Sequence, residues 1–258
     1  MRHNRAPMGF SIDIREQDGL RTLRFESSCV QGAMHIDQPW ELVLEYTQLM
    51  MAALLLRSES DFPGKVLLIG LGAGSLTKFL YRHCPEARLT VVEIAPEVVT
   101  AARQHFGLPD DSARLEVVVG DGVEYMRTAR DSYDLILVDG FNEHAHPGDL
   151  NRLPFYRDCR SRLSGQGLLV TNLIGLSQRY KGGLAYIEDV FEGRAVSFPR
   201  CRSGNTIAVA TAGSPVEIAL ETLEQRARML AERTGLDLLP MLEKMKADPH
   251  WPDGTLRI

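Results

Sequence analysis

The sequence of 258 residues has little of what marks membrane proteins, disulfide-rich proteins and nucleic-acid-binding proteins. It contains no run of 18 apolar residues, about the length that a helix needs to span a bilayer. Its four cysteines are scattered without a Cys-x-x-Cys pair, so we expect free thiols, no metal site and no disulfide framework. Its 29 basic and 34 acidic residues give a net charge of −5, which provides no basic surface for nucleic acid.

The first residues also lack the apolar core of a secretory signal peptide, since Met1 to Pro7 is polar and locally basic. Unpaired cysteines make a reducing compartment the default. These absences predict a cytoplasmic protein with no membrane or nucleic-acid partner. The hydrophobic content of 44% suits one sizeable α/β domain with appendages, or at most two domains.

The most informative stretch begins with a strand, a glycine turn and a helix. Val66 to Ile69 is an apolar run next to glycine, as expected for a strand buried on both faces. The turn GLGAG follows at once, and Ser75 to Arg82 is predicted to be helical. Glycines let the backbone approach a ligand closely, and the free N–H groups at a helix start favour electron-rich groups. The candidate ligand-binding residues of the turn are Gly70, Gly72 and Gly74.

A second strand follows this helix and ends in an acidic residue. Leu89 to Val92 is apolar, and Glu93 stands at its carboxyl end. Ligands of open α/β sheets bind at this edge, where a carboxylate can accept hydrogen bonds from both hydroxyls of a ribose. A dinucleotide fingerprint would have glycine or alanine in place of Ser75. The Gly-x-Gly-x-Gly form resembles instead that of class I S-adenosylmethionine-dependent enzymes, so the unit predicts a nucleoside-containing ligand.

The whole chain predicts an α/β fold with three parts. Residues 1–40 are expected to form a small N-terminal antiparallel β subdomain, with a hairpin turn at Asp18-Gly19. Residues 41–213 are expected to form a Rossmann-like, doubly wound domain that binds the nucleoside and carries out catalysis. Residues 214–258 are expected to form a helical extension.

Inside the central domain, apolar runs alternate with segments of helical spacing. A helix from Glu41 to Leu56 is expected to lead into five parallel strands, each followed by a helix. The fifth strand is placed at Leu168 to Asn172, and the last strands at 194–198 and 206–210. By analogy with methyltransferase-like folds, and not from periodicity, these last two are expected to form a hairpin-like pair that adds an antiparallel strand. Two amphipathic helices, Pro215 to Arg233 and Leu238 to Lys246, are expected in the extension.

Acidic or amide side chains stand at the carboxyl ends of four predicted strands. They are Glu93, Asp121, Asp139 and Asn172. Because these ends meet at one edge of a parallel sheet, we expect the four side chains to face one cleft. The alternative for each alone is a helix N-cap, which Asp and Asn favour, and it stays open for Asp121 and Asn172.

The order of these motifs resembles that of the spermidine synthase, or polyamine aminopropyltransferase, family. The chain contains, in order, GLGAG, VVEI, GDG, YDLILVD and FYRDCRSRLSGQGLLVTN. The likeness covers about Val30 to Asn172 and includes a glutamine in the β subdomain and a tyrosine on the helix before the sheet. It implies a divergent member of the family: a transferase of polyamine biosynthesis with a methyltransferase-like fold, and a possible homodimer.

The resemblance also implies roles in binding the nucleoside. Glu93, with Ile94 beside it, would hold the ribose hydroxyls. Asp121 with Gly122 would meet the adenine, and Gln31 matches a glutamine that contacts the aminopropyl donor. The donor of the family is decarboxylated S-adenosylmethionine, which is a co-substrate, so we expect no tightly bound cofactor.

Asp139 matches the acid that orients and deprotonates the attacking amine. An alkylammonium has a pKa near ~10, so it must lose a proton before its nitrogen can attack carbon. The nitrogen would attack the methylene group next to the sulfonium in line, and 5′-methylthioadenosine would leave. The acceptor implied is a small-molecule amine.

At the positions that bind the amine in the family, this sequence departs from the family pattern. The family has an Asp in the glycine turn where this chain has Ala73, and a second acid after Asp139 where this chain has Asn142. The family's Tyr-His-Glu is Tyr46-Thr47-Gln48 here, so Tyr46 and Asn142 are the candidate residues for binding the acceptor. One charge-assisted hydrogen bond is worth about 1.5–3 kcal/mol, so losing two weakens binding of the same polycation by about 10²–10⁴.

Three functions are consistent with the sequence. The first is an aminopropyltransferase that uses decarboxylated S-adenosylmethionine and an amine. The second is a methyltransferase that uses S-adenosylmethionine itself, which the loss of the Asp at Ala73 favours. The third is a catalytically silent protein that binds a nucleoside, which the lost amine-binding acids favour and the retained Asp139 opposes.

Overall fold

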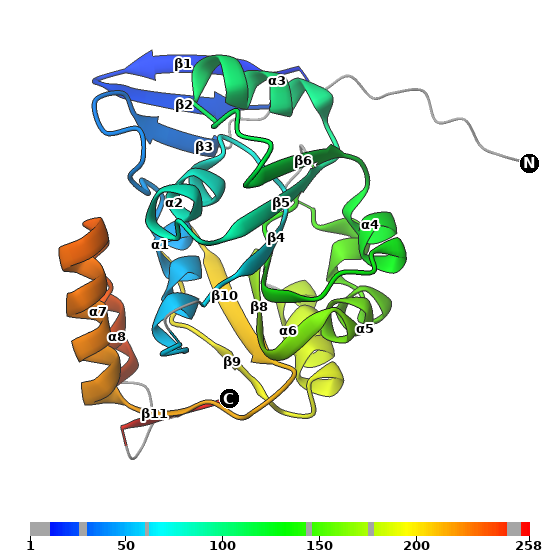
Figure 1. Cartoon of the computed structure of the whole chain (residues 1–258), viewed down its shortest axis with the longest axis vertical. Helices are drawn as coiled ribbons and strands as arrows, with labels where there is room; N and C mark the ends of the chain where they lie inside the picture. Colours follow the sequence, from blue (N-terminus) through cyan, green and yellow to red (C-terminus); the bar gives the residue numbers. More distant parts are fainter. Residues whose placement is uncertain (1–10, 26–29, 60–61, 143–145, 175–177, 247–253) are drawn as a thin grey trace, which may run out of the picture.

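A seven-stranded sheet forms the centre of the computed structural model (Figure 1), which describes residues 11–25, 30–59, 62–142, 146–174, 178–246 and 254–258. Its order is β6-β5-β4-β7-β8-β10-β9. The strands are β4 (Lys65–Ile69), β5 (Arg88–Glu93), β6 (Leu115–Val119), β7 (Tyr133–Val138), β8 (Leu163–Ile174), β9 (Ala195–Ser197) and β10 (Asn205–Thr211). β4 to β8 are parallel, whereas β10 is antiparallel to β8 and β9. The predicted doubly wound sheet with a closing antiparallel pair is confirmed.

Helices cover both faces of this sheet (Figure 1). On one face lie α1 (Glu45–Met50), the 3₁₀ helix η1 (Met51–Leu55), α2 (Ser75–His83) and α3 (Pro96–His105); on the other lie α4 (Gly122–Thr128), α5 (Leu153–Ser161) and α6 (Gln178–Val190). Successive strand residues serve different faces, since Leu68 packs in the core under α1 to α3 and Leu67 in the core under α4 to α6. The strands are continuous apolar runs in sequence because both faces are buried.

A small antiparallel sheet precedes the central one. Its strands are β1 (Asp13–Gln17), β2 (Leu20–Arg24) and β3 (Val30–His35). The first hairpin turns at Asp18 and Gly19, whose φ values of 51° and 76° are typical of the tight turn that the sequence predicts. The backbone of β3 lies against the glycine turn, since a Cβ at Gly32 would come within 2.8 Å of the amide nitrogen of Ala73. This contact sets β3 at the ligand-facing edge of the central sheet.

The C-terminal part packs outside α1 and η1 (Figure 1). It contains α7 (Leu220–Thr234), α8 (Leu239–Lys246) and a two-stranded sheet of β11 (Glu217–Ala219) and β12 (Thr255–Arg257). The helix predicted from Pro215 begins only at Leu220, because residues 217–219 pair with the end of the chain. Among the residues that the structure describes, none of the helices combines the length and the apolar character that crossing a bilayer requires.

Two further elements begin at residues other than those predicted. The helix expected from Glu41 begins at Glu45, because the backbone of Leu44 is extended with φ −84° and ψ 129°. β8 begins at Leu163 rather than Leu168, because a shift in its register with β7 accommodates the glycines before Leu168.

Helix α6 and the short 3₁₀ helix η2 (Gly148–Asn151) are not expected from the sequence. Gly182 and Gly183 weaken the helical pattern of α6, since glycine is a poor helix former. The structure gives Gly183 a packing role, because a Cβ there would lie 2.3 Å from the side-chain oxygen of Asn151. The glycine therefore allows α6 to approach η2 closely.

Candidate active site

A cavity of about 820 Å³ opens at the carboxyl edge of the parallel strands. It is bounded by the glycine turn, β3, α1, the loop after β7 and the loop before β10. Ten of the predicted site residues line it: Gln31, Tyr46, Gly70, Gly72, Glu93, Ile94, Asp121, Gly122, Asp139 and Asn142. Asn172, the fourth of the strand-end side chains, lines it as well.

The glycine turn closes against the end of β7. Gly70 has a φ of +98°, and a Cβ there would lie 2.3 Å from the backbone oxygen of Asp139, so only glycine fits without displacement. Gly74 does not line the cavity. It is the residue before α2, with a φ of +70°, and packs beside Leu108. The structure therefore gives Gly74 a role in starting the helix, and a direct ligand contact by this residue has no support.

Glu93 is fixed at the tip of β5 by backbone donors. Its Oε2 accepts a hydrogen bond from the amide of Leu71 at 2.8 Å, and its Oε1 accepts one from the amide of Ala95 at 3.0 Å. Burial raises the pKa of this carboxyl, and the surrounding backbone N–H groups act in the opposite direction. Glu93 also lines the cavity, so this oriented carboxylate faces the space in which a ligand would lie.

Asp121 is the N-cap of α4. Its Oδ1 accepts bonds from the amides of Val123 at 2.7 Å and Glu124 at 3.2 Å. The N-cap interpretation that the sequence left open is thus confirmed for Asp121. Since the same residue lines the cavity, its contact with an adenine remains a prediction that the cap does not exclude.

Asp139 lies at the end of β7 between an amide and a phenol. Its Oδ1 accepts a hydrogen bond from Nδ2 of Asn172 at 2.8 Å, and the Tyr46 hydroxyl interacts with the same carboxylate. Burial raises the pKa of Asp139, and both neighbours oppose this shift. Burial, followed by the charge of Asp139, raises the pKa of Tyr46 well above its usual value. The arrangement is an oriented proton acceptor of raised basicity.

Asn142 closes the loop that follows Asp139. Its side-chain oxygen accepts a bond from the amide of His146 at 2.9 Å, and its own amide donates to the carbonyl of His146 at 3.0 Å. Residues 143–145 of this loop lie outside the described residues. His146 and the exposed Asp149 do line the cavity.

The sequence reasoning missed the loop before β10. Arg202, Ser203 and Asn205 all line the cavity. Nδ2 of Asn205 donates to Oδ1 of Asn172 at 2.9 Å, so this loop reaches Asp139 through one intermediate residue. The missed signal is the direction of β10: an antiparallel strand brings its first residue, and not its last, to the carboxyl edge of the parallel strands.

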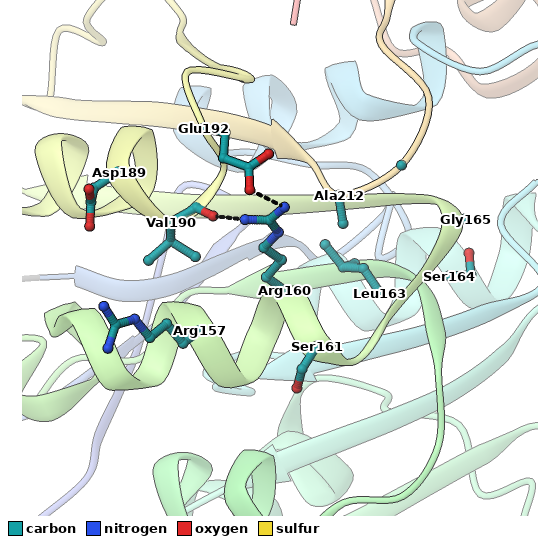
Figure 2. A pocket seen from close by; sticks show the side chains of 11 residues that line it. Arg157, Arg160, Ser161, Leu163, Ser164, Gly165, Asp189, Val190, Glu192 and Ala212 are labelled. Carbon is teal, nitrogen blue, oxygen red and sulfur yellow. Dashed lines mark hydrogen bonds and ion pairs between the residues drawn. The ribbon is translucent and has the colours of Figure 1, made fainter.

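A second hollow, of about 690 Å³, lies at the opposite edge of the sheet, beside the start of β8 (Figure 2). Its Arg160 donates to the carbonyl of Val190 and to Glu192, the latter at 2.8 Å. These charged groups already satisfy one another, and the hollow is far from the glycine turn and the strand-end acids. The cavity at the carboxyl edge is therefore the candidate site.

A largely parallel sheet with this strand order, a glycine turn after β4 and an acid at the end of β5 are typical of transferases with a methyltransferase-like fold. The model of the spermine/spermidine synthase domain matches residues 45–177, just over half of the chain. The chain belongs to the spermine/spermidine synthase family.

Named relatives extend this comparison. The polyamine aminopropyltransferase of Neisseria meningitidis serogroup A is 38% identical over 243 residues, which are 94% of this chain and 92% of that protein. A probable spermidine synthase from Corynebacterium glutamicum has a similar structure, with a TM-score of 0.73, 20% identity and coverage of 85% and 83%. Human methyltransferase-like protein 13, in complex with SAH, has a TM-score of 0.65 and 28% identity, with coverage of 79% and 100%.

Proposed function

We propose that this protein transfers an aminopropyl group from decarboxylated S-adenosylmethionine to a small-molecule amine and releases 5′-methylthioadenosine. The observation that carries the proposal is the single cavity that joins Glu93 at the nucleoside end to Asp139 at the other. The 38% identity with a polyamine aminopropyltransferase over nearly the whole chain supports the same reaction.

The nucleoside end would bind the adenosyl group of the donor. Glu93, already oriented by two backbone amides, would accept hydrogen bonds from the ribose hydroxyls. Ile94 is 57% exposed although it lines the cavity, so its apolar side chain is available to cover the adenine. Asp121 and Gly122 would meet the adenine edge, and Gln31 the donor chain.

The reaction would be a displacement at carbon. The neutral amine nitrogen forms a bond to the methylene carbon next to the sulfonium, and the carbon–sulfur bond breaks with its electron pair remaining on sulfur. The proton that the amine gives up is accepted by Asp139, whose raised pKa makes it a stronger base than an exposed aspartate. Tyr46 and Asn172 hold this carboxylate in place.

The acceptor would lie between Asp139, Tyr46 and the loop that Asn142 closes. Because the family's second acid is Asn142 here, a diamine has one charged partner fewer at this end than in the family pattern. We expect the protein to bind such a diamine more weakly than a family member that keeps the second acid.

A second candidate is methyl transfer from intact S-adenosylmethionine. Ala73 carries no charge that would repel the carboxylate of the donor, and Arg202 adds a cation to the lining of the cavity. Human methyltransferase-like protein 13, which is 28% identical and whose structure contains SAH, is a further reason to consider methyl transfer. The match to aminopropyltransferases covers more of the chain, so we place this function second.

Calorimetric titration with decarboxylated S-adenosylmethionine, S-adenosylmethionine and 5′-methylthioadenosine separates the candidates. Tighter binding of the decarboxylated donor and of methylthioadenosine supports aminopropyl transfer, and an amine screen that detects methylthioadenosine release then identifies the acceptor. Tightest binding of S-adenosylmethionine favours the methyltransferase. If none of the three ligands binds, both proposals fail.

A cytoplasmic location and a homodimer belong to the same proposal. Among the described cysteines, Cys84, Cys159 and Cys201 are free thiols, which suits a reducing compartment. The homodimer follows from the family resemblance alone, and light scattering of the purified protein tests it.

A further inference from the structure

Three side chains behind Asp139 form a continuous chain of hydrogen bonds. The Ser203 hydroxyl donates to Oδ1 of Asn205 at 2.6 Å. Nδ2 of Asn205 donates to Oδ1 of Asn172 at 2.9 Å, and Nδ2 of Asn172 donates to Oδ1 of Asp139 at 2.8 Å. Asn172 and Asn205 are 4% and 5% exposed, so water does not compete for these two amides. The chain therefore connects the rim of the cavity to the proposed proton acceptor.

The direction of this chain follows from the chemistry of its last member. An ionised carboxylate only accepts, so the amide of Asn172 must turn its nitrogen toward Asp139. Its oxygen then faces Asn205 and requires a donor, which fixes the nitrogen of Asn205 there. The oxygen of Asn205 is left to accept from Ser203, whose hydroxyl can rotate to donate. Every donor in the chain thus points toward Asp139.

The strand pairing explains why these residues meet. Asp139 and Asn172 directly follow Val138 and Thr171, which are partners in the parallel register of β7 and β8. Asn172 is opposite Ile207 in the antiparallel pair of β8 and β10, and Asn205 is two residues before Ile207 on the same face. The contact between Asn172 and Asn205 is therefore made between adjacent strands, and only Ser203 joins from the loop before β10.

We infer that Asn205 is a positioning residue, which holds the Asn172 amide in the one orientation that commits Oδ1 of Asp139 to accepting. The inference rests on the proposed role of Asp139 as proton acceptor. A proton on Oδ1 would compete with the hydrogen bond from Asn172, and turning the Asn172 amide over would require Asn205 and Ser203 to turn over with it. The hydrogen-bond chain therefore disfavours that state, and we assign the proton of the substrate amine to Oδ2.

Other titratable groups surround Asp139, and the test must separate their effects on Asp139 from the effect of the hydrogen-bond chain. Tyr46 on α1 interacts with the carboxylate, and Cys201, in the loop before β10, lies near Tyr46. Burial raises the pKa of the Cys201 thiol to about 11, and that of Tyr46 is higher than usual, so both are neutral where Asp139 ionises. Six more charged or titratable groups of the described residues line the cavity: Glu45, Glu93, Asp121, His146, Asp149 and Arg202. A direct probe of Asp139 is therefore needed besides the rate.

The test is a carbon-13 NMR titration of the Asp139 carboxyl together with the pH dependence of kcat/KM. Asn205→Asp has the same shape, but when ionised it can only accept, so it reverses the Asn172 amide and adds a like charge. We expect the pKa of Asp139, and the acidic limb of kcat/KM, to move up by about one to two pH units. Asn205→Ala removes the donor without adding charge and should shift both in the same direction by less.

Two further variants keep the test decisive. Ser203→Ala, at the exposed rim, removes only the last link and should fold normally, with a shift of a few tenths of a pH unit in the same direction. Thr206→Val, at a buried neighbour on β10 that is not part of the hydrogen-bond chain, should leave the pKa of Asp139 unchanged.

If the Asn205 and Ser203 variants lose activity equally at all pH values, with the Asp139 titration unmoved, the residues are merely structural and the inference is overturned. If the pKa of Asp139 shifts as expected in the variants but the wild type transfers no aminopropyl group, the positioning role of Asn205 is supported and the proposed function fails.

Discussion

Asp139→Asn removes one negative charge from the cavity and almost nothing else. The new side chain has the same shape, and its amide oxygen can still accept the hydrogen bond that Nδ2 of Asn172 makes to Oδ1 at 2.8 Å. A neutral amide also needs no desolvation of charge, whereas burial disfavours the ionised form of Asp139. We therefore expect the free energy of unfolding to change by less than about 1 kcal/mol, or to increase slightly.

The effect on the reaction should be much larger. A positioned general base contributes about 10²–10⁴ to the rate, so kcat/KM should fall by this factor, or about 3–5 kcal/mol of transition-state stabilisation. In the wild type, kcat/KM should also decrease as the pH falls through the raised pKa of Asp139, because the protonated acid no longer accepts a proton. The variant should lose this acidic limb.

Release of 5′-methylthioadenosine, followed by chromatography under single-turnover conditions, measures the chemical step. The matched control is Asp131→Asn, which removes an exposed carboxylate that pairs with Lys65 at 3.3 Å, outside the cavity. The control should retain wild-type turnover. Full turnover in Asp139→Asn would refute the proton-acceptor argument, and equal losses in both variants would indicate a general effect of charge.

Three further predictions concern the glycine turn, a buried lysine and the nucleoside end. Gly70→Ala should destabilise the fold by about 1–3 kcal/mol more than Gly107→Ala, because both have positive φ but only Gly70 would clash with Asp139. Burial lowers the pKa of Lys78 from 10.5 to about 8, so the cost of burying its ammonium is present below pH ~8 and fades toward pH ~10.5. Methionine carries no such cost. In urea denaturation, the free energy of unfolding of Lys78→Met, measured relative to wild type, should therefore decrease by up to about 3 kcal/mol as the pH rises from ~8 to ~10.5. Glu93→Gln should weaken calorimetric binding of methylthioadenosine at least ~10-fold, through loss of charge-assisted bonds to the ribose.

Each of these predictions has a result that contradicts it. Equal destabilisation by the two glycine variants would mean that the turn can move away from β7. A stability difference for Lys78→Met that does not change with pH would show that the lysine titrates alike in the folded and unfolded chains. Unchanged affinity of Glu93→Gln for methylthioadenosine would show that the ribose binds in another part of the cavity.

The strand-end residues could be predicted from the sequence because the topology places them. Once the apolar runs are read as parallel strands, the residues that follow them must meet at one edge, and Glu93, Asp139 and Asn172 do line one cavity. The glycine turn is equally local, since Gly70 is needed where the chain turns directly against β7. These features depend on neighbours in sequence and on one rule of sheet topology.

The features that sequence reasoning missed depend on contacts between distant segments. β11 forms only because residues 255–257 return to it, and this pairing shortens the helix predicted from Pro215. α6 contains Gly183, whose packing against Asn151 no local pattern reveals. Asn205 reaches the site because β10 is antiparallel, so the strand contributes its first residue to the carboxyl edge.

Glu45 links the lining of the cavity to helix α8. Its Oε2 accepts a bond from the amide of Arg202 at 2.9 Å, and its Oε1 pairs with Lys244 on α8 at 3.2 Å. We therefore expect substitutions along α8 to alter this part of the cavity lining without touching Asn172 and Asp139. Partly exposed contacts of this kind contribute little to stability, so they can change over evolution at low cost. If the proposed acceptor site is correct, α8 is a place where substitutions would change the surroundings of the acceptor without touching the proposed proton acceptor.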